Sequence, residues 1–261
     1  MTTSIIQNKF IIKNKILRKL IVAAVWLGIW QLVYLSVQQE ILLVSPACVV
    51  KRIFELSHQG TFWMTALYSM LRILQGFLYG LLIGTGLAVL TSACDILFDI
   101  FHPVISVVKA TPVASFIILA LVWMQSDHVP VFTSCLMVVP IVWSNVTNGI
   151  QKTDVRLLQM ARCYRFGAFK TMRRIYIPSV MPFFTAACTT GLGLAWKAGI
   201  AAEVLANTKL SIGGQIYSAK IYIETEDLFA WTAVVIVMSV LLESIMIRLM
   251  KKIGRKYNAV Q

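Results

Sequence analysis

Hydrophobic residues in this chain form long runs, separated by short polar segments. Crossing the hydrocarbon core of a bilayer takes about 20 mostly apolar residues in a helix, and six runs are long enough. The alternating ten-residue pattern of barrel strands is missing, so helices must satisfy the backbone hydrogen bonds within lipid. The sequence therefore predicts an all-α polytopic membrane protein. Its six expected spans lie near 20–37, 63–91, 101–125, 130–150, 180–206 and 229–249.

Composition supports a membrane location. Of the 261 residues, 58% are hydrophobic and 13% charged, and the mean hydropathy is +0.77, which is more apolar than soluble domains are. The first run follows a basic segment, as in a secretory signal, but no small-residue cleavage site follows Val37, so we expect this run to remain as a span. The five cysteines lack the spacing of metal ligands and are interpreted as apolar fillers.

Basic residues are concentrated in three segments that six spans would place on one side. Five Lys or Arg residues precede the first span, seven lie in the loop 151–178, and five lie near the C-terminus. Basic loops stay in the cytoplasm, so both termini are expected there, and the net charge of +13 requires no nucleic-acid partner. We divide the chain into a basic segment 1–19, a membrane domain 20–250 and a basic tail 251–261, and expect segment 92–100 to be a short cytoplasmic loop.

The loop 151–178 contains a predicted amphipathic helix. Thr153 or Asp154 can cap its N-terminus, and apolar residues recur with helical spacing. Arg162 and Arg165 share a neighbouring face, from which they can reach acceptors on a partner. From the residues alone, docking on a partner protein and lying on the bilayer surface remain equal alternatives. The apolar stripe consists of Leu157, Met160, Ala161 and Tyr164.

This loop resembles the EAA loop of permease subunits of ABC importers. Aligning on Pro178 places Gln159, Met160 and Ala161 at the Glu-Ala-Ala positions and Arg165 at the family's glycine. We expect Gly167 to supply the left-handed turn that the family's glycine provides. By this resemblance, the residues that couple the permease to an ATPase are Leu157, Gln159, Met160, Ala161, Arg162, Tyr164, Arg165, Phe166 and Gly167.

Further segments narrow the resemblance to the permeases for nitrate, taurine, alkanesulfonates, bicarbonate and thiamine precursors. The matching segments are Leu43–Pro46 with Val49, Ser69–Phe77, Lys109–Pro112, Ala195–Trp196 with Ala202–Glu203, and Ser211–Gly214. The resemblance implies a type I importer of a bacterial cell membrane, with two permease copies, two cytosolic ATPase subunits and an external solute-binding protein. The chain has no phosphate-binding loop, so ATP and Mg²⁺ are expected on the ATPase subunits and no cofactor on this chain.

Four residues are candidates for the translocation path or its gate: Lys109, Pro112, Trp196 and Glu203. An ionisable side chain inside an apolar helix should face the bundle interior or water. For Arg72 we favour pairing with a carboxylate such as Glu203, or extension of the side chain from a helix end to the interface, and for Lys109 these roles and a path role are equal alternatives. The glycines Gly76, Gly80, Gly84 and Gly86 include two four-residue spacings, which predict close helix packing. The alternatives are an ion-gradient-driven secondary carrier and, less favoured, an intramembrane enzyme or a scaffolding subunit.

Overall fold

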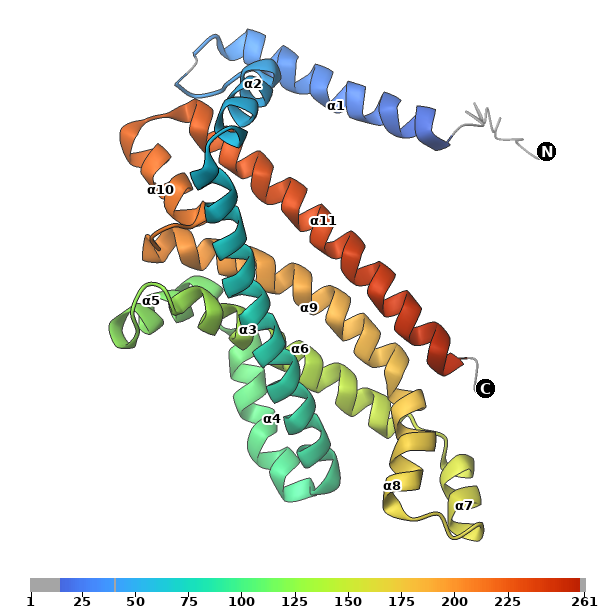
Figure 1. The fold of residues 1–261 in the computed structure, drawn as a ribbon. Helices are drawn as coiled ribbons and strands as arrows, with labels where there is room; N and C mark the ends of the chain where they lie inside the picture. Colours follow the sequence, from blue (N-terminus) through green and yellow to red (C-terminus); the bar gives the residue numbers. More distant parts are fainter. Residues whose placement is uncertain (1–14, 40, 259–261) are drawn as a thin grey trace, which may run out of the picture.

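The computed structural model describes residues 15–39 and 41–258, and this part of the chain consists of helices joined by short connections, without strands (Figure 1). The basic segment 1–19 and the tail 251–261 lie mostly outside the residues whose side chains are described. The helices are α1(Lys15–Val37), α2(Pro46–Ser57), α3(Gly60–Ala93), α4(Asp95–Ala110), α5(Val113–Trp123), α6(Val129–Gln151), α7(Val155–Cys163), α8(Ala168–Thr171), the π-helical turn η1(Met172–Tyr176), α9(Ile177–Ala206), α10(Ile212–Tyr222) and α11(Thr225–Asn258).

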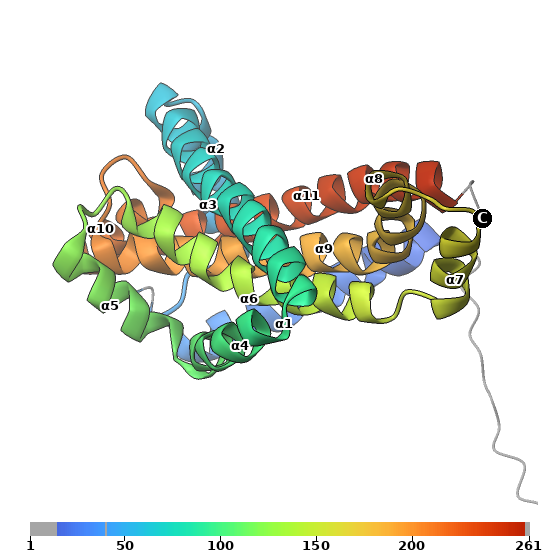
Figure 2. The ribbon, with the colours of Figure 1, turned by 90° about the horizontal axis from the view of Figure 1, so that it is seen from below.

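Helices α3, α6 and α9 pack together and form the centre of the bundle (Figures 1 and 2). The glycines of α3 set the separation between α3 and α6, because a Cβ at Gly80 would lie 2.6 Å from Val138 Cβ, and one at Gly84 would lie 2.8 Å from Val142 Cβ. The successive glycines meet successive turns of α6, so the two helices run in the same direction. Close packing at Gly80 and Gly84 confirms the prediction, whereas a Cβ at Gly86 would meet nothing within 4 Å.

The two ends of the bundle carry different short helices (Figure 1). At the α10 end, α10 and α2 pack against α11. There the Arg52 guanidinium donates to Asp227, with Nη2 at 3.0 Å from Oδ2, and this hydrogen bond raises the pKa of Arg52 above its usual range. At the opposite end, the α7 end, α7 and α8 lie beyond α6. Helix α1 extends away from the bundle, and its Trp30 indole donates to the Val44 carbonyl at 3.1 Å.

The number of spans differs from the sequence prediction. Among the described residues, four helices are long and apolar enough to cross a membrane: Gly60–Ala93, Val129–Gln151, Ala168–Ala206 and Thr225–Lys252. Helices α4 and α5 together would make a fifth, but they meet at 104°, and the described apolar part of α1, Ile21–Val37, is shorter. Six spans are therefore not confirmed.

One expected span, 101–125, is wrong as a continuous helix. Thr111 has an extended backbone (φ −80°, ψ 133°), because the ring of Pro112 disfavours the helical conformation at the residue before it. The expected loop 92–100 is also wrong, since Cys94 alone separates α3 from α4, and Asp95 already begins the new helix.

Candidate functional site

The loop 151–178 is a helical hairpin. Asp154 caps α7, and its Oδ1 accepts from the Arg156 N–H at 2.8 Å, which satisfies one of the free donors of the first turn. Thr153, the other predicted cap, is buried and instead donates to the Gly149 carbonyl at 3.2 Å. The second half of the hairpin, α8 and η1, runs without a break into α9.

The apolar stripe of α7 is divided between the hairpin and the surface. Ala161 is 3% exposed and packs inward. Met160 is 42% and Tyr164 73% exposed, and Leu157 is exposed as well. Gln159 and Arg162 are exposed as well. The Lys170 ammonium stands 3.9 Å from the centroid of the Phe166 ring. The predicted residues are thus gathered on one short hairpin, with three apolar side chains turned outward.

Arg165 itself makes the turn that ends α7. Its φ is +52°, and the Phe166 N–H donates to the Ala161 carbonyl at 2.8 Å while the Arg165 N–H donates to Arg162 at 3.0 Å. These two bonds define a Schellman motif with Arg165 in the left-handed position that glycine usually takes. The prediction that Gly167 supplies this turn is wrong, because Gly167 has φ −66° and precedes α8.

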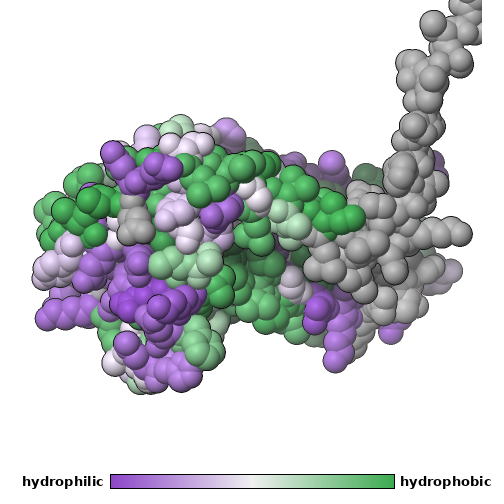
Figure 3. All heavy atoms as spheres, turned by 90° about the horizontal axis from the view of Figure 1, so that it is seen from above, coloured by the Kyte–Doolittle hydropathy of each residue, from purple (hydrophilic) through white to green (hydrophobic). Residues whose placement is uncertain are grey.

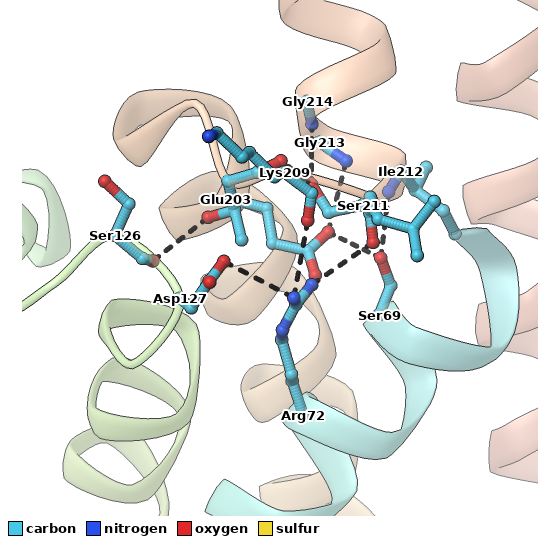
Figure 4. Close-up of polar contacts among 12 residues, drawn as sticks. Ser69, Arg72, Ser126, Asp127, Glu203, Lys209, Ser211, Ile212, Gly213 and Gly214 are labelled. Carbon is cyan, nitrogen blue, oxygen red and sulfur yellow. Dashed lines mark hydrogen bonds and ion pairs between the residues drawn. The ribbon is translucent and has the colours of Figure 1, made fainter. Parts of the chain in front are cut away.

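A polar network occupies the α10 end (Figure 4). Glu203, near the end of α9, is 0% exposed. Its Oε2 accepts from Ser69 Oγ of α3 at 2.8 Å and from the Gly213 N–H at 3.1 Å. Ser69 Oγ in turn accepts from the Ile212 N–H at 2.8 Å. The carboxylate therefore lies at the N-terminus of α10, where the helix dipole favours negative charge, and one hydroxyl holds α3, α9 and α10 together.

Arg72 joins the same end of the bundle to the loop between α5 and α6. Its Nη2 lies 3.4 Å from Asp127 Oδ1, and the guanidinium donates to the carbonyls of Lys209 and Leu210 at 3.3 Å. Pairing with a carboxylate was expected, but the partner is Asp127 instead of Glu203. In the same place Thr208 Oγ1 donates to the Ser126 carbonyl at 3.1 Å. The fully buried Glu203 belongs to this network in the structure, and its gate role stays a prediction.

The other path candidates lie in separate places. Trp196 is 1% exposed, and its indole N–H donates to the Val235 carbonyl of α11 at 3.2 Å. This position favours a role in helix packing over a role in the path. Lys109 and Pro112 are exposed at the bend between α4 and α5. Sequence reasoning missed Lys197, an exposed lysine within α9; the signal was a cation in the middle of the expected span 180–206.

On the face that Figure 3 shows, hydrophilic residues gather most densely toward the left end, and hydrophobic residues cover much of the remaining coloured surface. Together with the long apolar helices, this distribution defines a multi-pass helical membrane protein with a basic hairpin at one end and a polar network at the other.

The family of inner membrane components of binding-protein-dependent transport systems matches residues 76–258. The match covers more than half of the chain, and the chain belongs to this family. It is therefore the permease subunit of an ABC importer and a protein of the cell membrane, and an ion-gradient-driven carrier is not favoured.

Three relatives show what this chain is similar to. It is 24% identical over 251 residues to the aliphatic sulfonates transport permease protein SsuC of Bacillus subtilis (strain 168), covering 94% of this chain and 89% of SsuC. It is 24% identical over 206 residues to the nitrate import permease NrtB of Synechocystis, covering 75% and 74%. The match to the Synechocystis bicarbonate permease CmpB, at 26% over 162 residues, covers 62% and 58%.

Solved structures share the fold. The inward-facing MetNI methionine ABC transporter gives a TM-score of 0.62 at 14% identity, with 76% of this chain and 96% of the other covered. An amino acid ABC transporter gives 0.58 at 16% identity, with 75% and 94% covered. The prediction of a type I importer permease fold is confirmed, apart from the number of spans.

Proposed function

We propose that this chain forms the translocation path for a small anion. Separate ATPase subunits bind α7, and their ATP hydrolysis drives the transport. The relatives are named as permeases for aliphatic sulfonates, bicarbonate and nitrate, and we extend that class of solute to this protein. The working assembly would contain two copies of this permease, two cytosolic ATPase subunits that hold ATP and Mg²⁺, and one external binding protein that delivers the solute.

The observation that carries the proposal is the outward-facing side of α7. Met160 and Tyr164 expose large apolar surface at the tip of the hairpin, and Arg162 and Arg165 adjoin them. The hairpin lies beyond the end of the bundle (Figure 1), where a lipid-facing helix would have no hydrocarbon to cover it. An apolar centre with a polar rim is the usual composition of a protein interface, so we favour a docked partner over the bilayer surface.

In this mechanism, the ATPase pair moves the two hairpins as it closes on ATP. Helices α8, η1 and α9 are continuous, so a displacement of the hairpin reaches the centre of the bundle directly. Closure would favour the outward-open state and hydrolysis the inward-open one, as a population shift between two conformations. Both termini and the α7 end would face the cytoplasm. The α10 end would face the external binding protein.

Charge reversal at the hairpin tests the coupling role. We expect the double variant Arg162→Glu, Arg165→Glu to insert into the membrane but to lose co-purification with the co-expressed ATPase in mild detergent. The matched control is Lys51→Glu, Lys220→Glu, which makes the same charge change at exposed positions of α2 and α10 and should retain the ATPase. If the hairpin variant binds the ATPase as well as the unchanged protein does, the assigned roles are wrong.

A further inference from the structure

The polar residues of α4 lie on one stripe of an otherwise apolar helix. Their spacing of four, three, four and three residues keeps them, at about 100° per residue, within an arc of about 80°. All of these side chains are exposed. The stripe consists of Asp95, Asp99, His102, Ser106 and Lys109.

The stripe lies between two different apolar faces. On one side, α4 packs on the bundle: Ile105 is buried, and the Phe98 ring stacks on Trp143 with centroids 5.6 Å apart. On the other side, Ile100 and Val104 are more than half exposed, as lipid-facing residues are. The stripe therefore lies along the border of the packed face, where the His102 ring stands 6.1 Å and the Lys109 ammonium 5.8 Å from the Trp143 ring centroid, and it points away from the exposed apolar surface.

Lys109 is the member of the stripe farthest from the α7 end. It is 14 positions from Asp95, or about 21 Å along the helix axis, whereas the hydrocarbon core is about 30 Å thick. The Lys109 ammonium lies 5.8 Å from the centroid of the Trp143 ring, and none of the described residues forms an ion pair with it. Arg72, the cation in α3, has Asp127. A cation at this depth without a carboxylate requires water or a counter-ion.

We infer that the α4 stripe is the wetted wall of the translocation path and that Lys109 is the cation that attracts a small anion into it. This inference rests on the proposed transport function and adds the residues that select the charge of the solute. Lys109 stands at the bend between α4 and α5, and Asp95 and Asp99 follow toward the α7 end. An anion that leaves Lys109 for the α7 end passes Asp99 and Asp95, whose repulsion keeps it from resting there and opposes its return once it has left.

Thiol labelling tests the inference without a known solute. Ser106→Cys places a thiol one helical turn from Lys109, and Val104→Cys places one on the exposed apolar face. The full chain, assembled with its ATPase in membrane vesicles, is treated with two methanethiosulfonate reagents, the anionic sulfonatoethyl and the cationic trimethylammonium-ethyl compound. Peptide masses report each site separately from the native cysteines, in the nucleotide-free and in the ATP-trapped state.

We expect the Ser106→Cys thiol to react at least tenfold faster than the Val104→Cys thiol in one of the two states, since thiolates form in water and hardly at all in lipid. Adding Lys109→Met should lower the ratio of anionic to cationic labelling about tenfold, and Lys109→Arg should preserve it. Slow labelling at Ser106→Cys in both states would overturn the inference. So would a ratio of anionic to cationic labelling that Lys109→Met leaves unchanged.

Co-purification of the ATPase from the same vesicles separates the two proposals. Absence of the ATPase in the unchanged protein contradicts the proposed function, whereas an assembled complex with an unreactive Ser106→Cys thiol contradicts the inference alone.

Discussion

Arg165 ends α7 in the left-handed backbone region, where contact between its Cβ and the backbone raises the conformational free energy by about 1–2 kcal/mol. We expect Arg165→Gly to be more stable than Arg165→Ala by about 1 kcal/mol, a difference that isolates the backbone because both changes remove the guanidinium. Thermal unfolding in detergent, followed by tryptophan fluorescence, measures it. Equal midpoints for the two variants would show that the φ of +52° carries no strain.

Single residues also show where sequence reasoning reaches its limit. The Asp154 cap was predictable because its partner, Arg156, is two positions away. The surroundings of Glu203 were not, since its hydroxyl partner Ser69 comes from a different helix, 134 positions earlier. The turn at Arg165 was assigned to Gly167 because glycine is the usual residue in that conformation; nothing in the local pattern shows that an arginine would adopt it.

Helix pairs in the bundle depend on how closely their backbones approach. A Cβ at Gly80 would collide with Val138, whereas one at Gly86, on the same helix, would meet open space. We expect Gly80→Ala to lower the unfolding midpoint by several degrees, because it pushes α3 and α6 apart. Gly86→Ala should leave the midpoint unchanged or raise it, since alanine favours helix over glycine. The pair of thermal melts decides, and similar destabilisation by both changes would point to a general intolerance of α3.

The bend between α4 and α5 shows what hydropathy does and does not predict at this scale. An apolar run gives the presence of helix in 101–125, and Pro112 gives a reason for a break. The angle of 104° depends on how α5 packs against α6 and α9, and residue spacing within the run contains no information about those neighbours. Counting spans from run length alone therefore overestimates the number of straight crossings in such a chain.

The molecule has long apolar helices between a basic hairpin at one end and a polar network at the other, a distribution that hydropathy predicts well because each span must match the bilayer. Its direction in the membrane rests on a different property, the position of its basic residues. The hairpin of α7 and η1 is rich in Arg and Lys, whereas the segment from the end of α9 to the first turn of α11 carries Glu224, Glu226 and Asp227 against two lysines, Lys209 and Lys220. Basic segments near spans are retained in the cytoplasm, so the α7 end should be inside.

Native Cys163 gives a direct measurement of that direction. It is exposed at the end of α7, so a membrane-impermeant maleimide should label it in inside-out vesicles. The same reagent should not label it in cells whose outer envelope has been permeabilised while the cell membrane stays intact. Lys220→Cys, on the exposed side of α10, should show the opposite pattern, which controls for reagent leakage. Labelling of Cys163 from outside would place the hairpin on the external side of the membrane. A cytosolic ATPase could not bind α7 there, so the proposed coupling through the hairpin would be wrong.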